Sequence, residues 1–149
     1  MTDTRIPEAT MEFEATIVVV DRDHAGYEAL APLCAGEEAS LRFLSTGREA
    51  LRLAAADRVA LWLIGVVLPD MSGFDLQQML RDGSQEAAAC MVAAAYRSED
   101  EIRSHRAGAT MYVCKPLQAI WLRPCIRGAR ARVESLHRNE AAPVPRLIT

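Results

Sequence analysis

The sequence lacks several of the features that mark specialised classes of protein. Aromatic residues make up only 5% of its 149 residues, so the core must be built mainly from aliphatic side chains. The longest apolar runs, ALWLIGVVL and AAACMVAAAY, are shorter than the ~20 residues that a membrane-spanning helix needs. The amino-terminal residues are polar and acidic, unlike a signal peptide. These absences predict a soluble, cytoplasmic protein that has no membrane partner.

A large excess of charge of one sign is also missing. The formal net charge is −3, which excludes the strongly basic chains typical of general nucleic-acid binders. Basic residues do gather toward the carboxyl end. We interpret them as a solvated helix face, with nucleic-acid binding as the weaker alternative. They are Lys115, Arg123, Arg127, Arg130, Arg132, Arg138 and Arg146.

Motifs for catalysis or metal binding are absent as well. The chain has no G-x-S-x-G, Walker or G-x-G-x-x-G motif. Its four cysteines lack metal-ligand spacing and are predicted to be reduced thiols, and its three histidines are isolated in the sequence. Cys114 lies next to Lys115, and a neighbouring cation lowers a thiol pKa, but we favour an inert thiol there. We therefore expect no enzyme activity and no catalytic residues.

What the sequence does contain is a regular alternation of apolar runs with helical segments. Uniformly apolar strands that alternate with helices indicate a parallel sheet covered on both faces. The length suits one domain, which we place at residues 16–138. A flexible leader (1–15) precedes it, and a disordered tail or the start of a linker (139–149) follows. The predicted strands are Thr16–Val20, Leu41–Phe43, Leu61–Gly65, Ala88–Ala94 and Thr110–Cys114.

Local signals predict where several helices begin. Asp23 is positioned to cap the first helix, and Thr46 or its neighbour Ser45 the second. Ser98 and Glu101 form an S-x-x-E capping box for the fourth helix.

The last helix carries an apolar seam at helical spacing and is predicted to end near Arg138. Because Pro124 falls early in it, either the helix starts near Arg123 or its first turns are bent.

In sheets of this kind the working crevice lies beyond the carboxyl ends of the strands. The residues at those ends are Asp21, Gly65, Ala94 and Lys115. Around them, the segments IVVVDRD, LIGVVLPDMSGFDL, AAAYRSEDE and GATMYVCKP resemble the receiver domain of two-component response regulators (the CheY-like family). The resemblance extends over roughly Glu14 to Leu136. It implies a flavodoxin-like (βα)5 three-layer sandwich with a parallel sheet of order 2-1-3-4-5, and a cis peptide at Lys115-Pro116.

The resemblance also identifies what this sequence has lost. Receivers accept a phosphoryl group on their own aspartate at the end of the third strand. Aligning LPDMSG with the family motif places the position of that acceptor at Gly65. Receivers use an acidic pair to bind Mg²⁺, and here Arg22 follows the retained Asp21. At the end of the fourth strand, receivers have a Ser or Thr whose hydroxyl hydrogen-bonds the phosphoryl oxygen, and this chain has Ala94 there. Lys115 resembles the family lysine.

Three losses together predict a degenerate pseudo-receiver that acts independently of phosphorylation. A family site with three carboxylates and one lysine carries a charge of about −2, whereas here the charge is about zero or positive, so Mg²⁺ binding is predicted to be lost. Asp23 is better placed as a cap than as a metal ligand. Asp70 is interpreted as a turn residue that stabilises local backbone, not as a relocated acceptor. Arg22 either folds over the pocket to pair with Asp21 or points into solvent.

We expect this domain to signal through protein–protein contact. The resemblance suggests the face of the fourth helix, fifth strand and last helix, with Tyr112, Trp121 and Ile126 as anchors, for a homodimer or an effector. Tyr112 resembles the family's aromatic switch residue, or is an ordinary half-buried tyrosine. The alternative function is a small-ligand sensor that binds an anion or nucleotide in the vacated pocket. The chain is either a stand-alone regulator or a segment of a larger regulator or hybrid kinase.

Overall fold

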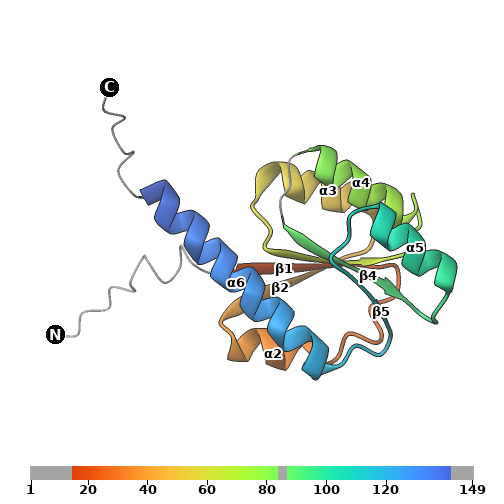
Figure 1. Cartoon of the computed structure of the whole chain (residues 1–149), viewed down its shortest axis with the longest axis horizontal. Helices are drawn as coiled ribbons and strands as arrows, with labels where there is room; N and C mark the ends of the chain where they lie inside the picture. Colours follow the sequence, from red (N-terminus) through yellow and green to blue (C-terminus); the bar gives the residue numbers. More distant parts are fainter. Residues whose placement is uncertain (1–14, 84–86, 142–149) are drawn as a thin grey trace.

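The computed structural model describes residues 15–83 and 87–141. Five parallel strands form one sheet in the order β2-β1-β3-β4-β5, as predicted. Five helices cover its two faces, giving a flavodoxin-like three-layer sandwich (Figure 1). The strands are β1 (Ala15–Val20), β2 (Ala39–Leu44), β3 (Leu61–Gly65), β4 (Ala88–Ala93) and β5 (Met111–Cys114). The helices are α2 (Leu30–Gly36), α3 (Gly47–Ala56), α4 (Gly73–Asp82), α5 (Ser98–Arg106) and α6 (Ala119–Ala141).

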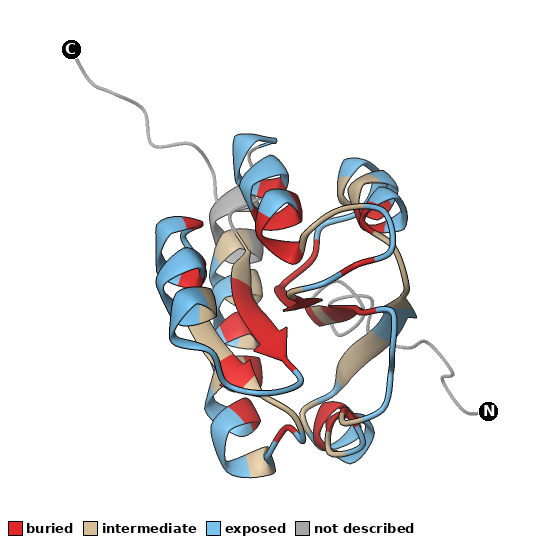
Figure 2. Cartoon of the chain, turned by 90° about the vertical axis from the view of Figure 1, so that its right-hand side faces the viewer, coloured by how far each residue is buried: buried red, intermediate tan, exposed pale blue. Residues whose placement is uncertain are grey.

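The sheet separates two hydrophobic cores. Central strands β1, β3 and β4 are buried on both faces, which explains their uninterrupted apolar sequences (Figure 2). Ile17 and Leu63 point into the core beneath α2 and α6, whereas Val18 and Trp62 point into the core beneath α3 and α4. α5 lies beside α4 on the second face (Figure 1). This arrangement brings the carboxyl ends of the strands together at one edge.

One of the predicted helix caps is present and two are wrong. Thr46 caps α3 in a full capping box with Glu49. Asp23 does not cap α2, because the chain turns at Gly26, with φ 93°, and the helix begins only at Leu30. The Asp23 carboxylate instead accepts a hydrogen bond from the N–H of Ala25.

The capping box predicted at the start of α5 does not form. Ser98 is already the first helical residue, and the cap position is taken by Arg97, whose side chain makes no capping bond. The Glu101 carboxylate accepts a hydrogen bond from the Tyr96 hydroxyl at 2.7 Å and is therefore engaged outside the helix.

The last helix ends later than predicted, and its start excludes the predicted alternative of a start near Arg123. α6 begins at Ala119, so Pro124 lies inside it, and it runs to Ala141, beyond Arg138. Ala15 belongs to β1, whereas the rest of the predicted leader and residues 142–149 lie outside the described residues. Within the described residues, no helix is both long enough and apolar enough to cross a bilayer.

Candidate functional site

All six predicted pocket residues line one small hollow at the carboxyl ends of the strands. The hollow has a volume of about 130 Å³. The residues arrive from the ends of β1, β3, β4 and β5, which the parallel pairing places side by side. Val66, Val67 and Val92 complete the wall. The six predicted residues are Asp21, Arg22, Asp23, Gly65, Ala94 and Lys115.

Asp21 is the centre of this hollow. Its side chain is only 7% exposed, and Lys115 Nζ lies 3.1 Å from Oδ2. The same oxygen accepts a hydrogen bond of 2.7 Å from the Tyr27 hydroxyl. Oδ1 accepts one of 3.1 Å from the N–H of Asp23. A buried carboxylate needs such compensation, and here both oxygens of Asp21 already have partners.

Tyr27 is the site residue that sequence reasoning missed. Its helical spacing identified it as core, and its ring does pack in the core beneath α2 and α6. The hydroxyl, however, reaches back to Asp21. Burial first, and then the Asp21 charge and hydrogen bond, raise the pKa of Tyr27, so it remains a neutral donor. Lys115 Nζ also lies 5.0 Å from the ring centroid of Tyr27.

Lys115 ties the fifth strand to the loop after the first. Besides Asp21, its Nζ donates to the carbonyl of Asp23 at 2.8 Å. Its aliphatic stem packs against Gly26, where an added Cβ would lie 2.8 Å from Lys115 Cδ. The cis peptide Lys115-Pro116 follows, as the family resemblance implied. Two oxygen atoms of the chain, one from Asp21 and one from Asp23, therefore hold the Lys115 ammonium group.

The space over Gly65 is taken by Asp21. A Cβ built on Gly65 would lie 2.7 Å from Asp21 Cγ and 2.8 Å from its Oδ2, closer than real Cβ contacts allow. On the opposite side Gly73 lies directly against the carbonyl oxygen of Gly65, and its N–H donates to the carbonyl of Val66 at 2.9 Å. The strand end is thus packed around a glycine.

Arg22 and Ala94 border the hollow without filling it. Both are exposed, and Ala94 presents only a methyl group. Among the described residues Arg22 makes no ion pair, so of the two predicted alternatives the structure has the solvent-exposed one. Lys115, not Arg22, is the cation that pairs with Asp21.

The groups present do not fit a magnesium ion. Mg²⁺ requires near-octahedral oxygen ligands and is usually held by one or two carboxylates. Both oxygens of Asp21 are occupied, and the Asp23 carboxylate bonds to a backbone N–H in its own turn. The described part of the chain contains no group of three or more His, Cys, Asp or Glu side chains suited to hold a metal.

Asp70 does more than stabilise its own turn, which corrects the narrower prediction. Its Oδ1 and Oδ2 accept hydrogen bonds, both of 2.9 Å, from the N–H groups of Gly47 and Arg48 at the start of α3. These backbone donors lower the pKa of Asp70. A carboxylate at a helix amino terminus is favoured by the helix dipole. The loop after β3 is therefore anchored to α3.

Tyr112, the predicted switch residue, is held at the edge of the site. Its hydroxyl accepts a hydrogen bond of 3.1 Å from the backbone N–H of Arg97, in the loop that follows β4. Its ring meets Tyr96 edge-on at a centroid distance of 5.9 Å. Tyr112 is half-buried, and burial is the main cause that raises its pKa.

Of the predicted interaction anchors, Trp121 is 40% exposed and is open to a partner. The prediction that Ile126 is an anchor is wrong. Ile126 is fully buried, because the apolar seam of α6 packs on the sheet. The face formed by α5, β5 and α6 does carry other exposed apolar side chains, which we call the α5–β5–α6 cluster together with Trp121. They are Tyr96, Ile102 and Ile120.

Part of the basic surface of α6 is neutralised within the chain. Arg127 Nε lies 3.0 Å from Glu37 Oε2, and an Arg130 nitrogen lies 3.2 Å from Glu38 Oε1. These pairs fasten α6 to the turn after α2 and favour the solvated-face interpretation over a nucleic-acid surface.

Residues 17–127 match the response regulator receiver domain. The chain belongs to this family. This receiver domain is 31% identical over 131 residues to the DNA-binding response regulator MtrA of Mycolicibacterium smegmatis, a match that covers 88% of the chain and 54% of MtrA. It is 36% identical over 73 residues to the transcriptional regulatory protein HprR of Escherichia coli K12, covering 49% of the chain and 32% of HprR.

Solved structures show the same fold. A CheY-like receiver domain protein from Methanospirillum hungatei superposes with a TM-score of 0.70 at 24% identity, over 83% of this chain and 98% of that one. The receiver domain of an HD domain-containing protein from Pseudomonas fluorescens gives 0.71 at 20% identity, over 82% and 98%. The chain matches whole receiver domains, but it spans about half or less of the curated regulators. Receiver domains are generally signalling modules, not enzymes.

Proposed function

We propose that this receiver domain signals without phosphorylation, through contact with a protein partner. The observation that carries the proposal is the position of Asp21: its carboxylate lies over Gly65, where an acceptor side chain would stand, and is bound to Tyr27 and Lys115. Both oxygens of Asp21 and the ammonium group of Lys115 are paired with groups of the chain itself. The domain is a pseudo-receiver in which an internal ion pair replaces the phosphoryl group and its metal.

The chemistry of the remaining groups supports this proposal. Phosphoryl transfer needs a nucleophile placed in line and charge stabilisation of the phosphoryl oxygens. Gly65 supplies no nucleophile, Ala94 no hydroxyl, and Arg22 no metal ligand. Lys115, which could stabilise negative charge, is already paired with Asp21. Restoring one of these three groups by substitution would still leave the other two missing.

The α5–β5–α6 cluster is the surface we assign to the partner. Ile102 of α5 and Ile120 of α6 are 52% and 72% exposed, and Trp121 of α6 is a further large apolar side chain open to solvent. Exposed apolar groups in contiguous patches mark interaction sites. The partner is either an effector protein or a second copy of the domain.

The test is a titration with Mg²⁺ and beryllofluoride followed by amide NMR shifts. We expect no saturable shifts at Asp21, Gly65, Ala94 or Lys115, whereas a receiver with an acceptor aspartate, run in parallel, responds. Saturable shifts at these strand ends in the native chain would refute phosphorylation independence.

The small-ligand alternative stays a prediction. A hollow of about 130 Å³ is small beside the 300–1,000 Å³ typical of ligand sites, which disfavours a nucleotide. Inorganic phosphate titrated under the same conditions tests the remaining case, since saturable shifts at Lys115 with phosphate alone would favour anion sensing.

A further inference from the structure

Two cysteines meet between the sheet and the last helix. Cys90 lies on β4 and faces the core beneath α2 and α6, where it is 1% exposed. Cys125 lies on α6, is half-buried, and packs against the same core. Both are free thiols, and their side chains share a hydrogen bond. Two thiols in contact can be converted to a disulfide by a two-electron oxidant.

The two thiols differ in reactivity. The hydrogen bond from Cys90 lowers the pKa of Cys125, whereas the same bond, together with burial, raises the pKa of Cys90. The thiolate is the form that attacks an oxidant. Cys125 is also the more exposed of the two, so a solute that arrives from solvent reaches it first. Cys125 thus has the properties of the attacking thiol, and Cys90 those of the thiol that completes the disulfide.

We propose that Cys125 and Cys90 form a peroxide-sensitive thiol pair that closes to a disulfide between α6 and β4. The Cys125 thiolate attacks one oxygen of the peroxide, so that the O–O bond breaks and Cys125 becomes a sulfenic acid. The Cys90 sulfur then attacks the Cys125 sulfur, the S–O bond breaks, and the departing hydroxide takes the Cys90 proton as water. For hydrogen peroxide, two thiols lose two electrons and two protons, and the peroxide becomes two waters.

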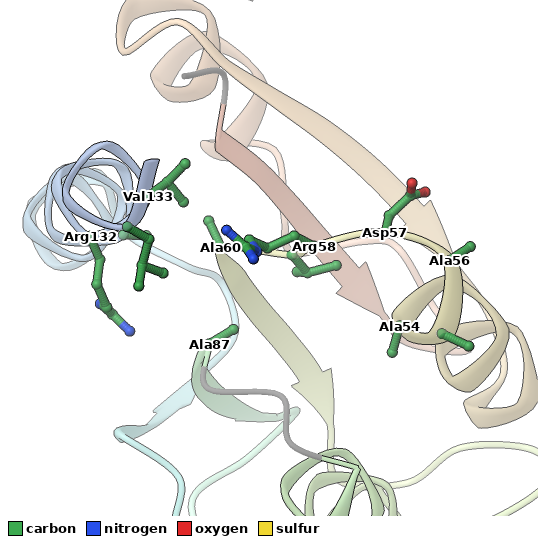
Figure 3. A pocket seen from close by; sticks show the side chains of 12 residues that line it. Ala54, Ala56, Asp57, Arg58, Ala60, Ala87, Arg132 and Val133 are labelled. Atoms are coloured by element: carbon green, nitrogen blue, oxygen red, sulfur yellow. The ribbon is translucent and has the colours of Figure 1, made fainter. Parts of the chain in front are cut away.

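The packing of α6 leaves room for this bond to close. Sulfur atoms in a disulfide lie about 2.05 Å apart, so two thiols in contact must approach by about 1–2 Å. β4 is held by β3 and β5 on its two sides, and α6 is therefore the element that moves. Just after Cys125, the second half of α6 borders a hollow of about 680 Å³ that is lined largely by alanines (Figure 3). Pro124 also gives the carbonyl of Ile120 no N–H to bind, which loosens the helix beside Cys125.

The other two cysteines provide controls within the same chain. Cys34 faces the same core but is buried, and burial raises its pKa to about 11. Cys114 is half-buried like Cys125. Because side chains alternate along β5, Cys114 shares the opposite face of the sheet with Tyr112, whose hydroxyl it contacts. Oxidation of the folded chain should therefore join Cys90 to Cys125 and leave Cys34 and Cys114 as thiols.

The disulfide would fasten α6 to the middle of the sheet. Ile120 and Trp121 lie about one helical turn before Cys125, so a shift of α6 toward β4 also moves these two members of the α5–β5–α6 cluster. This consequence for partner binding rests on the proposed function, whereas formation of the bond does not.

The test is oxidation of the folded full chain with hydrogen peroxide, followed by alkylation of the remaining thiols and peptide mapping without reduction. We expect the Cys90–Cys125 disulfide within one chain, and alkylated Cys34 and Cys114. Cys114→Ser should leave the yield of this bond unchanged, and the preference for it should disappear in urea. Absence of the bond, bonds to Cys114 or between chains in equal yield, or the same preference in urea would each overturn the proposal.

Two single variants test the order of the two steps. In Cys90→Ser the sulfenic acid has no thiol to attack it, so we expect a dimedone adduct on Cys125 that the native chain lacks. In Cys125→Ser, Cys90 should remain unlabelled, because it is buried. The amide NMR spectrum of each variant before oxidation checks that the fold is retained. A dimedone adduct on Cys90 instead of Cys125 would overturn the roles given to the two thiols.

Discussion

Asp21 is fixed from three directions: by a backbone N–H in its own loop, by Tyr27 before α2, and by Lys115 after β5. Asp23 and Tyr27 lie in the same loop as Asp21, whereas Lys115 lies after β5, so the carboxylate joins this loop to a distant part of the chain. Removing one partner leaves a buried charge less compensated, which costs more than an exposed bond of the same length.

Tyr27→Phe deletes one of these partners and nothing else. Because Asp21 is buried and charged, we expect the free energy of unfolding to fall by about 1.5–3 kcal/mol. Urea unfolding at neutral pH measures this. Tyr96→Phe is the matched control: its hydroxyl also binds a carboxylate, that of Glu101, but Tyr96 is 60% exposed and little change is expected. Equal effects in the two variants would contradict the role given to Tyr27.

Replacing Gly65 tests whether Asp21 fills the acceptor's space. Gly65→Ala forces the Asp21 carboxylate away from Tyr27 and Lys115, and we expect a loss of about 1–3 kcal/mol in unfolding free energy. Gly65→Asp should lose more, because it adds a second carboxylate beside the first.

Neither Gly65 variant should gain a beryllofluoride response, since Arg22 and Ala94 are unchanged. A Gly65→Asp protein as stable as the native chain, or one that binds beryllofluoride, would show that the site is open.

At the level of elements, the start of α3 depends on two carboxylates. Asp70 bonds to the N–H groups of Gly47 and Arg48, and Glu49 completes the capping box with Thr46. The backbone bonds lower the pKa of both acids, with Gly47 the main cause for Asp70 and Ser45 for Glu49. Their contribution to stability is therefore present above the unfolded-state pKa of about 4 and is lost as the pH falls through the lower folded value.

Asp70→Asn keeps one acceptor oxygen and removes the charge. We expect a lower free energy of unfolding at pH 7. We also expect a smaller loss of stability between pH 5 and pH 2, because the variant lacks one carboxyl group whose pKa folding lowers. Thermal unfolding across this pH range measures both effects. Asp75→Asn, in the first turn of α4, is the matched control. A pH dependence unchanged from the native chain would contradict the role of Asp70.

The elements that were predicted well are those marked by a long, unbroken run of apolar residues. β3 matches Leu61–Gly65 to the residue, because an unbroken apolar run of this length, followed by Pro69, has few solutions other than a buried strand. The cap at Asp23 failed because its carboxylate accepts a hydrogen bond from Ala25 in its own turn. The cap at Ser98 failed because α5 already includes Ser98, which leaves Arg97 at the cap position. Ile126 failed because helical spacing reveals an apolar stripe but not whether it faces the sheet or a partner.

The candidate site was predicted in its residues but not in its bonding. Strand ends converge in any parallel sheet, so the residue set followed from the strands. The hydrogen bond from Tyr27 to Asp21 depends on the path of the loop at Gly26, and the reach of Asp70 to α3 joins residues 23 positions apart. Sequence spacing predicts neighbours within one helix or strand, but not contacts such as these, which depend on the path of a loop.

For the whole molecule, the α5–β5–α6 cluster predicts how the domain associates. Ile102→Glu combined with Ile120→Glu should leave thermal stability nearly unchanged, because both side chains are more than half exposed. The double variant should bind the partner, or a second copy, at least tenfold more weakly, as measured by sedimentation or calorimetry. Met79→Glu on α4, also exposed, is the control. Unchanged association in the double variant would move the interface elsewhere.

The close approach of Gly73 to the carbonyl of Gly65 determines what an acceptor side chain added at position 65 would meet. The main-chain path at the end of β3 is fixed by this glycine contact and by the hydrogen bonds of Val66, not by the side chain at position 65. In the pseudo-receiver that we propose, side chains of the site differ from those of the family while the backbone that presents them is kept. For protein engineering, an acceptor grafted at position 65 would therefore meet a displaced Asp21 but an unaltered backbone.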